Sequence, residues 1–300
     1  RDRDGAGDVG GSNRDPWQLS PGSGSSTGRK LQVLLVTPYS PTPAVHGGAV
    51  RMLNLLREMR RDCDVTLLSL SDTEAEMRPE SLRQLSELCR EVVVMRRDFG
   101  STWGWLSPTR ARGFCTPAMF EQIEHWLDRR HFDVVQTEYT HMAPYLPPKT
   151  EGLLRVLVEH DVTFVSVARE RRTAASRVRR LALWVDWMRT LRFEVQAVES
   201  ADLVLTMSED DKAALARFVD PGALVPVPNG VSCRDFPLRD PSEEEPTTVL
   251  FVGFFRHEPN VEAVLFFARE VLPKLRDRIP GVRFRVDGAY PPPPLHDLPG

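Results

Sequence analysis

The sequence predicts an α/β fold, with a doubly wound parallel-sheet N-terminal domain followed by an incomplete second Rossmann-like domain. Short apolar runs alternate with helical patterns along most of the chain. These runs are apolar throughout, which is typical of parallel strands that are covered on both faces. After a polar, proline-rich stretch, only one strand–helix–strand unit follows. We therefore expect a disordered tail or linker at 1–29, an N-terminal domain at 30–236, a linker at 237–247 and a truncated domain at 248–300.

Composition narrows the class of protein. The 300 residues are 41% hydrophobic, enough for a packed core. With 39 Lys and Arg against 42 Asp and Glu, the net charge of −3 argues against nucleic-acid binding. No apolar run has the ~18–20 residues of a membrane span. The four cysteines form no C-x-x-C pair, so neither a zinc site nor a disulfide framework is indicated, and a reducing cytoplasm fits best.

The first 29 residues are rich in Gly, Ser, Asp and Arg and have little to bury. Gly5–Gly10 matches G-x-G-x-x-G, but no strand precedes it and no helix follows, so it is not a nucleotide site. Two D-x-D strings, at 2–4 and 62–64, lie in the tail and before a strand. We read both as turns and expect no protein-bound metal. The chain begins with Arg1 and ends soon after a strand, and we expect it to be a fragment.

The strands of the first domain follow from apolar runs of strand length that are bounded by turn residues. We expect them at Leu31–Thr37, Asp64–Leu70, Val92–Met95, Asp133–Thr137, Leu153–Glu159, Ala201–Met207 and Leu224–Val227.

The helices of the first domain follow from helical spacing of apolar residues. Val50, Leu53, Leu56 and Met59 are expected on one face of the first helix. Further helices are expected near Pro79–Cys89, Ala118–Arg130, Ala174–Ser200 and Ser208–Phe218, the last opened by a capping box of Ser208 and Asp211. The stretch Phe99–Phe114 reads as irregular.

The second domain is expected to contain a strand at Thr248–Phe255, a helix from near Pro259 and a strand at Val282–Gly288. Apolar residues recur along that helix at helical spacing. They are Val261, Val264, Leu265, Ala268, Val271, Leu272 and Leu275. Since this single unit cannot cover a parallel sheet on both faces, we expect part of the sheet and helix to be uncovered.

Ligands of open α/β sheets bind outside the carboxyl ends of the strands, which selects the candidate residues. His46, Gly47 and Gly48 follow the first strand and begin a helix, where free N–H groups can bind an anion. A tight turn alone is the alternative. Glu138 follows one strand, and His160 and Asp161 follow the next. A carboxylate and an imidazole there suit hydroxyl binding, proton handling or stabilisation of a cationic transition state. For His160, a structural hydrogen bond is the alternative.

Two further loops are candidates. Asn229 and Gly230 end the last strand of the first domain, where glycine favours a sharp turn with positive φ and a role lining a crevice is the alternative. Gly253 follows the first strand of the second domain, and Arg256 lies in the loop after it, a geometry that suits a phosphate-bearing ligand.

Eight arginines fall between Arg169 and Arg192, beside Trp184, Trp187 and Phe193. A basic, aromatic helix of this kind fits peripheral contact with an anionic membrane surface. A solvated helix face with core aromatics is the reading that we favour.

The ordered pieces together resemble family-4 glycosyltransferases of the GT-B fold. The resemblance rests on VLLVTPYSPTPAVHGGAVRMLNLLREM, EHDVTF, ADLVLTMSEDDKAAL, VPNGVS and VLFVGFFRHEPNVEAVLFFAREVLPKL, in this order. It implies two facing domains and transfer of a sugar from a nucleoside-diphosphate sugar, the co-substrate, to a glycan or lipid-linked acceptor. It implies that the transfer retains the configuration of the sugar and needs neither a cofactor nor a metal. We expect a cytoplasmic enzyme, at the inner face of the membrane if the membrane contact exists.

By position, Gly47 and Gly48 match the family's glycine loop near the donor diphosphate, and Gly253 matches the glycine that opens the donor domain. Glu138 stands at a strand end where many members carry a histidine, and His160 at the next strand end. We hypothesise catalytic roles for Glu138 and His160.

The chain also departs from the family pattern. Phe254 and Asn260 stand where many members carry Arg and Lys for the leaving diphosphate. Arg256, or cations beyond Gly300, would substitute for them. The E-x7-E pattern is absent, and we expect the chain alone not to turn over. The alternatives are a sugar-nucleotide epimerase of the same fold and a non-catalytic ligand-binding or scaffold remnant.

Overall fold

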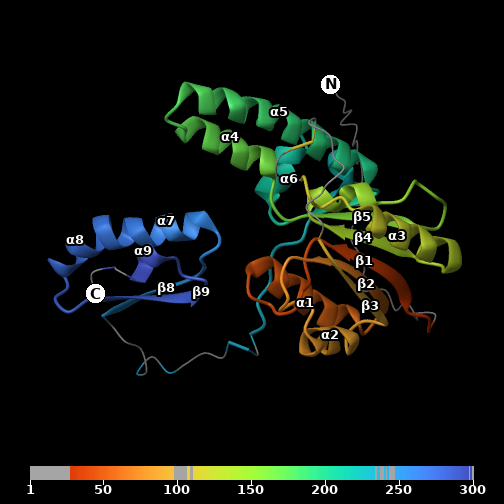
Figure 1. Ribbon diagram of the computed structural model, residues 1–300, viewed down its shortest axis with the longest axis horizontal. Helices are drawn as coiled ribbons and strands as arrows, with labels where there is room; N and C mark the ends of the chain where they lie inside the picture. Colours follow the sequence, from red (N-terminus) through yellow and green to blue (C-terminus); the bar gives the residue numbers. More distant parts are fainter. Residues whose placement is uncertain are drawn as a thin grey trace, which may run out of the picture. The chain divides into compact units, whose positions relative to one another are not determined.

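The computed structural model describes residues 28–296 and 298, except for 98–106, 109–110, 234, 237–239, 241 and 243–246 (Figure 1). The predicted tail at 1–29, apart from its last two residues, lies outside the described residues. So do Gly5–Gly10, most of the predicted linker at 237–247 and much of the irregular stretch at 99–114.

The first part of the described chain is a seven-stranded sheet in the order β3-β2-β1-β4-β5-β6-β7, with every neighbouring pair parallel. The strands are β1 (Leu31–Thr37), β2 (Cys63–Ser71), β3 (Glu91–Arg96), β4 (Val134–Glu138), β5 (Leu154–Glu159), β6 (Leu203–Thr206) and β7 (Leu224–Pro226). The order of the strands reverses between β1 and β4. This is the topological switch point at which open α/β sheets bind ligands.

Helices connect these strands, as Figure 1 shows. They are α1 (Gly47–Met59), α2 (Pro79–Ser86), α3 (Pro117–Arg129), the short 3-10 helix η1 (Thr140–Tyr145), α4 (Thr163–Thr173), α5 (Arg177–Ser200), α6 (Glu209–Leu215) and the 3-10 turn η2 (Pro221–Ala223). The N-cap of the capping box predicted for α6 is confirmed, because Ser208 Oγ accepts the N–H of Asp211 at 3.1 Å. The Asp211 carboxylate accepts from the Ser208 hydroxyl at 2.6 Å.

Both faces of the sheet are buried, which explains why its strands are apolar throughout. Val33 and Leu35 of β1 belong to a cluster with side chains of α1 and α2. Leu34 and Val36, which point to the other face, belong to a cluster with side chains of α3 and η1. The prediction of a doubly wound α/β fold is confirmed.

Two helical expectations are wrong in part. Val50 is 42% exposed, whereas Leu53 and Leu56 are buried. A helix turns about 100° per residue, so Val50 and Leu56 lie about 120° apart around α1. The helix expected at Ala174–Ser200 begins at Arg177, and α4, which the sequence did not predict, precedes it.

A second, two-stranded parallel sheet pairs β8 (Thr248–Phe254) with β9 (Arg283–Ala289). The chain connects them through α7 (Glu258–Phe266), a π-helical segment (Phe267–Val271) and α8 (Leu272–Arg276), and α9 (Pro293–His296) follows. Val261 and Val264 of α7 are buried with Phe255. Leu250 and Val252 of β8 are 57% and 70% exposed, so part of this sheet is uncovered, as the sequence predicted.

Candidate active site

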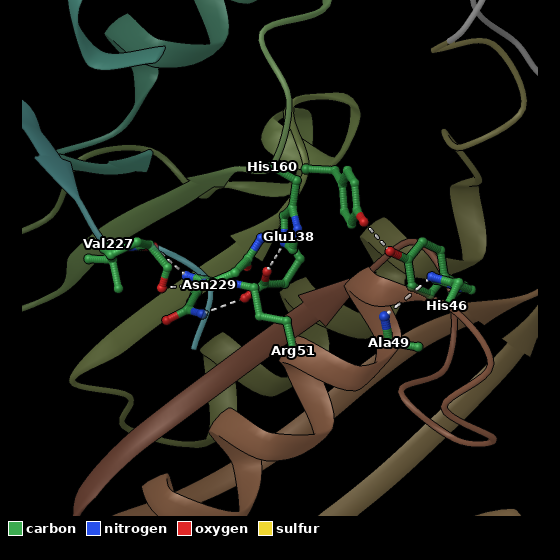
Figure 2. Close-up of polar contacts among 11 residues, drawn as sticks. His46, Ala49, Arg51, Glu138, His160, Val227 and Asn229 are labelled. Carbon is green, nitrogen blue, oxygen red and sulfur yellow. Dashed lines mark hydrogen bonds and ion pairs between the residues drawn. The ribbon is translucent and has the colours of Figure 1, made fainter. Parts of the chain in front are cut away.

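Three neighbouring strands bring the main candidates to one edge of the seven-stranded sheet. β1 leads into the loop before α1, β4 ends at Glu138, and β5 ends at Glu159 directly before His160. Because β1, β4 and β5 are adjacent and parallel, their carboxyl ends meet at the switch point. Figure 2 shows Glu138 and His160 beside the start of α1.

Glu138 and His160 form a hydrogen-bonded pair. Nε2 of His160 lies 2.5 Å from Oε2 of Glu138, and the Gln136 amide donates to Oε1 of Glu138 at 2.6 Å. Glu138 is only 1% exposed. A buried carboxylate needs such partners. We assign the proton to Nε2 of His160, so that the carboxylate fixes the orientation of the imidazole.

Tyr139 holds the imidazole from the other side. Its φ of 71° lies in the left-handed region, which costs a residue with a side chain about 1 kcal/mol or more. Its N–H nevertheless donates to the Val158 carbonyl at 2.8 Å. The Tyr139 ring stacks on His160, with 3.9 Å between ring centroids and 6° between planes. Tyr139 was not among the candidate residues that the sequence indicated.

A second tyrosine closes over the start of α1. The Tyr39 hydroxyl donates to the Tyr139 hydroxyl. A Cβ added to Gly48 would overlap both hydroxyls, whereas one added to Gly47 would meet nothing within 4 Å. Only Gly48 is therefore required by close approach. Burial raises the pKa of both Tyr39 and Tyr139, so each remains a neutral phenol able to donate a hydrogen bond.

His46 is the N-cap of α1. Its Nδ1 accepts the N–H of Ala49 at 3.3 Å (Figure 2), and its ring lies 4.5 Å edge-on from that of Tyr39. Burial lowers the pKa of His46, and the charge of His160 lowers it further. A neutral imidazole fits the acceptor role of a cap.

Arg51, which the sequence analysis did not select, joins α1 to the segment after β7. It is 9% exposed. Its guanidinium donates to the carbonyls of Val227 and Pro228 at 3.0 and 3.1 Å and to Oδ1 of Asn229 at 2.9 Å (Figure 2). Gly230 has no left-handed φ, and an added Cβ there would meet nothing within 4 Å. The sharp-turn interpretation of Gly230 is wrong.

Arg51 and Glu138 place opposite charges in this region of the molecule. Burial lowers the pKa of the Arg51 guanidinium, and the nearby Glu138 carboxylate raises it. The guanidinium is charged at neutral pH, as arginine is in proteins, and so places a positive charge near the Glu138 carboxylate. A cavity of about 720 Å³ lies beside Arg51, lined by α1 and by the segment after β7.

Two buried carboxylates lie behind the site, at the base of α4. Oε1 of Glu159 accepts the Thr140 hydroxyl, while Oε2 has no hydrogen-bond partner among the described residues. Glu194 of α5 caps α4, accepting the N–H groups of Thr163 and Phe164 at 2.6 and 2.9 Å. Burial, and then the charge of Glu194, raise the pKa of Glu159 well above its usual value. Burial raises the pKa of Glu194 to about 7.

The remaining predicted residues have other surroundings. Asp161 is exposed in the link between β5 and α4. Gly253 lies opposite Gly288 of β9, and an added Cβ would come within 2.7 Å of the Phe251 ring, so packing of its own sheet requires the glycine. The Arg256 guanidinium lies 4.1 Å from the centre of the Tyr290 ring.

Within the part of the chain that the structure describes, no group of three or more His, Cys, Asp or Glu is arranged to hold a metal ion. The Glu138–His160 pair offers hydrogen bonding, proton handling and charge stabilisation.

A family of known proteins matches most of the part of the chain that contains the seven-stranded sheet. The sequence model of Glycosyltransferase Family 4 matches residues 45–235. No curated protein is significantly similar in sequence. Sucrose-phosphate synthase of Thermosynechococcus elongatus is structurally similar, with 17% identity and a TM-score of 0.52 over 86% of this chain and 70% of that one. UGT71G1 of Medicago truncatula, complexed with UDP-glucose, has 10% identity and a TM-score of 0.50 over 87% and 67%. At these identities the likeness shows the fold alone, which is GT-B as the sequence predicted.

Proposed function

The chain belongs to glycosyltransferase family 4, and from this membership we propose that it serves the transfer of a sugar from a nucleoside-diphosphate sugar to a glycan or lipid-linked acceptor, with retention of configuration. The observation that carries the proposal is the buried Glu138–His160 pair at the switch point. It lies beside the start of α1, where Gly48 and the two tyrosine hydroxyls meet.

The donor diphosphate is proposed to lie near His46, Gly47 and Gly48. The N-terminus of α1 carries partial positive charge that favours an anion. The neutral hydroxyls of Tyr39 and Tyr139 add hydrogen-bond donors that can turn to a phosphate oxygen. The complex of the Medicago enzyme with UDP-glucose supports a nucleotide-sugar donor for this fold.

His160 is proposed to bind the reacting hydroxyl of the acceptor through Nδ1, the ring nitrogen that Glu138 does not contact. As the bond between the sugar and the diphosphate breaks, negative charge develops on the diphosphate and positive charge on the sugar. The Glu138 carboxylate is close enough to His160 to offset positive charge on the imidazole or on the sugar. The helix start offsets the charge of the leaving group.

The proposal includes neither a cofactor nor a protein-bound metal, as the family resemblance implies. The proposed compartment is the cytoplasm. The four cysteines all lie within the described residues and form no disulfide, which fits a reducing compartment.

A transfer assay tests the proposal. The full-length protein is given a panel of nucleoside-diphosphate sugars and acceptors, since we expect the 300-residue chain alone not to turn over, and proton NMR reads the anomeric configuration of the product. We expect retention, and losses of about 10²-fold or more in kcat for His160→Ala and Glu138→Gln. His125→Ala, an exposed histidine on α3, is the matched control and should keep the parent rate. An inverted product contradicts retention, and parent-like rates for both site variants contradict the proposed roles.

A further inference from the structure

The helices α4 and α5 form an antiparallel hairpin, joined by the three residues 174–176 (Figure 1). Among the residues that the structure describes, one side of α5 packs against the rest of the chain. Thr190, Glu194 and Ala197 are buried on that side, and Glu194 caps α4. The hairpin is thus firmly attached at its base.

The opposite side of α5 carries a row of exposed apolar residues, here called the apolar stripe. Its members are Val178, Leu181, Trp184, Val185 and Met188, with exposed fractions of 79%, 63%, 45%, 36% and 48%. At about 100° per residue, they centre on the side of the helix opposite Thr190, Glu194 and Ala197. None of these five side chains belongs to a hydrophobic core cluster of the described residues, and a contiguous row of exposed apolar side chains indicates an interaction surface.

The hairpin is also strongly basic. Residues 163–193 contain eight arginines and only two carboxylates, although the whole chain has a net charge of −3. The eight are Arg169, Arg171, Arg172, Arg177, Arg179, Arg180, Arg189 and Arg192. Arg177 and Arg192 are exposed and, at helical spacing, fall on the same side as the apolar stripe. Apolar side chains and cations therefore share one surface.

We propose that this hairpin docks on an anionic lipid bilayer, with the apolar stripe entering the boundary between headgroups and acyl chains and the arginines contacting lipid phosphates. Apolar side chains, a tryptophan and arginines on one helix side are what such a surface binds. No helix within the described residues has the length and apolar content of a membrane span. The inference does not depend on the proposed transfer reaction.

Charge favours a bilayer over a second copy of the chain. Pairing two hairpins through the apolar stripe would bring two arginine-rich surfaces together, and like charges on facing helices repel. An anionic bilayer instead supplies the opposite charge over the whole surface. Each arginine near such a surface contributes about a fivefold gain in affinity.

Co-sedimentation of the 300-residue protein with vesicles tests the proposal. The vesicles are phosphatidylglycerol mixed with phosphatidylcholine, and phosphatidylcholine alone for comparison. We expect binding to the anionic vesicles only, weakened by added salt. Leu181→Ser with Trp184→Ser should lower the partition coefficient about tenfold or more, and Arg177→Gln with Arg192→Gln about 25-fold.

Matched pairs of exposed residues outside the hairpin are the controls. Leu250→Ser with Phe266→Ser removes similar apolar surface, and Arg83→Gln with Arg278→Gln removes two exposed arginines. Both should bind like the parent, and circular dichroism should show that all four double variants are folded.

Failure of the parent to bind anionic vesicles overturns the proposal. So does parent-like binding of the variant lacking Leu181 and Trp184, or equal binding of the parent to neutral vesicles. Sedimentation velocity adds a further outcome: a parent dimer that this variant cannot form, without vesicle binding, would make the apolar stripe an interface between copies and would also overturn the proposal.

Discussion

Replacing Gly48 by alanine should destabilise the protein, because the two tyrosine hydroxyls occupy the space that a Cβ needs. Forcing a methyl group into a packed site costs about 1–3 kcal/mol. Separating the hydroxyls of Tyr39 and Tyr139 breaks their hydrogen bond, which costs about 1 kcal/mol more. Alanine is better than glycine in a helix by up to about 1 kcal/mol, which offsets part of this. The net expectation is a loss of about 1–3 kcal/mol.

Gly47→Ala is the matched control, since an added Cβ there meets nothing. We expect it to be neutral or to stabilise by up to about 1 kcal/mol. Urea unfolding of the two variants, compared at equal m-values, gives the difference between them, which should be about 2 kcal/mol or more.

A second background isolates the cause. With Tyr39→Phe and Tyr139→Phe in place, both hydroxyls are gone and the nearest remaining atom of the Tyr139 ring lies 3.3 Å from the added Cβ. Gly48→Ala should cost at least about 1 kcal/mol less there than in the parent. If Gly48→Ala and Gly47→Ala shift the midpoint equally in the parent, the hydroxyls do not close over Gly48 and the reasoning is refuted.

Two further predictions concern buried charges. Arg51→Met removes the donors to Val227, Pro228 and Asn229 and should lower the unfolding free energy in urea by about 2–3 kcal/mol. Arg57→Met replaces an exposed arginine on the same helix and should cost under about 0.5 kcal/mol. Equal costs would contradict the conclusion that Arg51 joins α1 to the segment after β7. The folded protein holds the Glu194 proton up to about pH 7, whereas the unfolded chain releases it near the ordinary pKa of 4.5, so the unfolding free energy should fall as pH rises through this window. Between pH 4.5 and 7, the unfolding free energy measured in urea should fall less steeply for Glu194→Gln than for the parent, and as steeply as in the parent for the exposed Glu199→Gln. If Glu194→Gln has the same slope as the parent, the folded protein does not retain the Glu194 proton.

The strands and the edge of the sheet that carries the site could be predicted because they follow from local pattern. A strand buried on both faces is apolar along its whole length, and β1 occupies the predicted residues Leu31–Thr37. Parallel pairing then brings strand ends together, which is how Glu138 and His160 were selected.

Contacts between distant segments could not be predicted in this way. Arg51 acts on a segment about 180 residues later in the chain, and nothing near it in sequence indicates that its side chain is buried. The left-handed backbone of Tyr139 has no local signal, because glycine is the residue that normally marks that conformation. The sequence did not predict α4, because only two of its residues, Phe164 and Val167, are buried. Two buried residues are too few to give a recognisable helical spacing of apolar side chains.

The short link between His160 and α4 couples two parts of the molecule. Only Asp161 and Val162 separate the imidazole from the first turn of α4, and the Glu194 carboxylate of α5 grips the amides of that turn. A change in the tilt of the two helices would therefore act on a stretch of backbone that lies only two residues from His160.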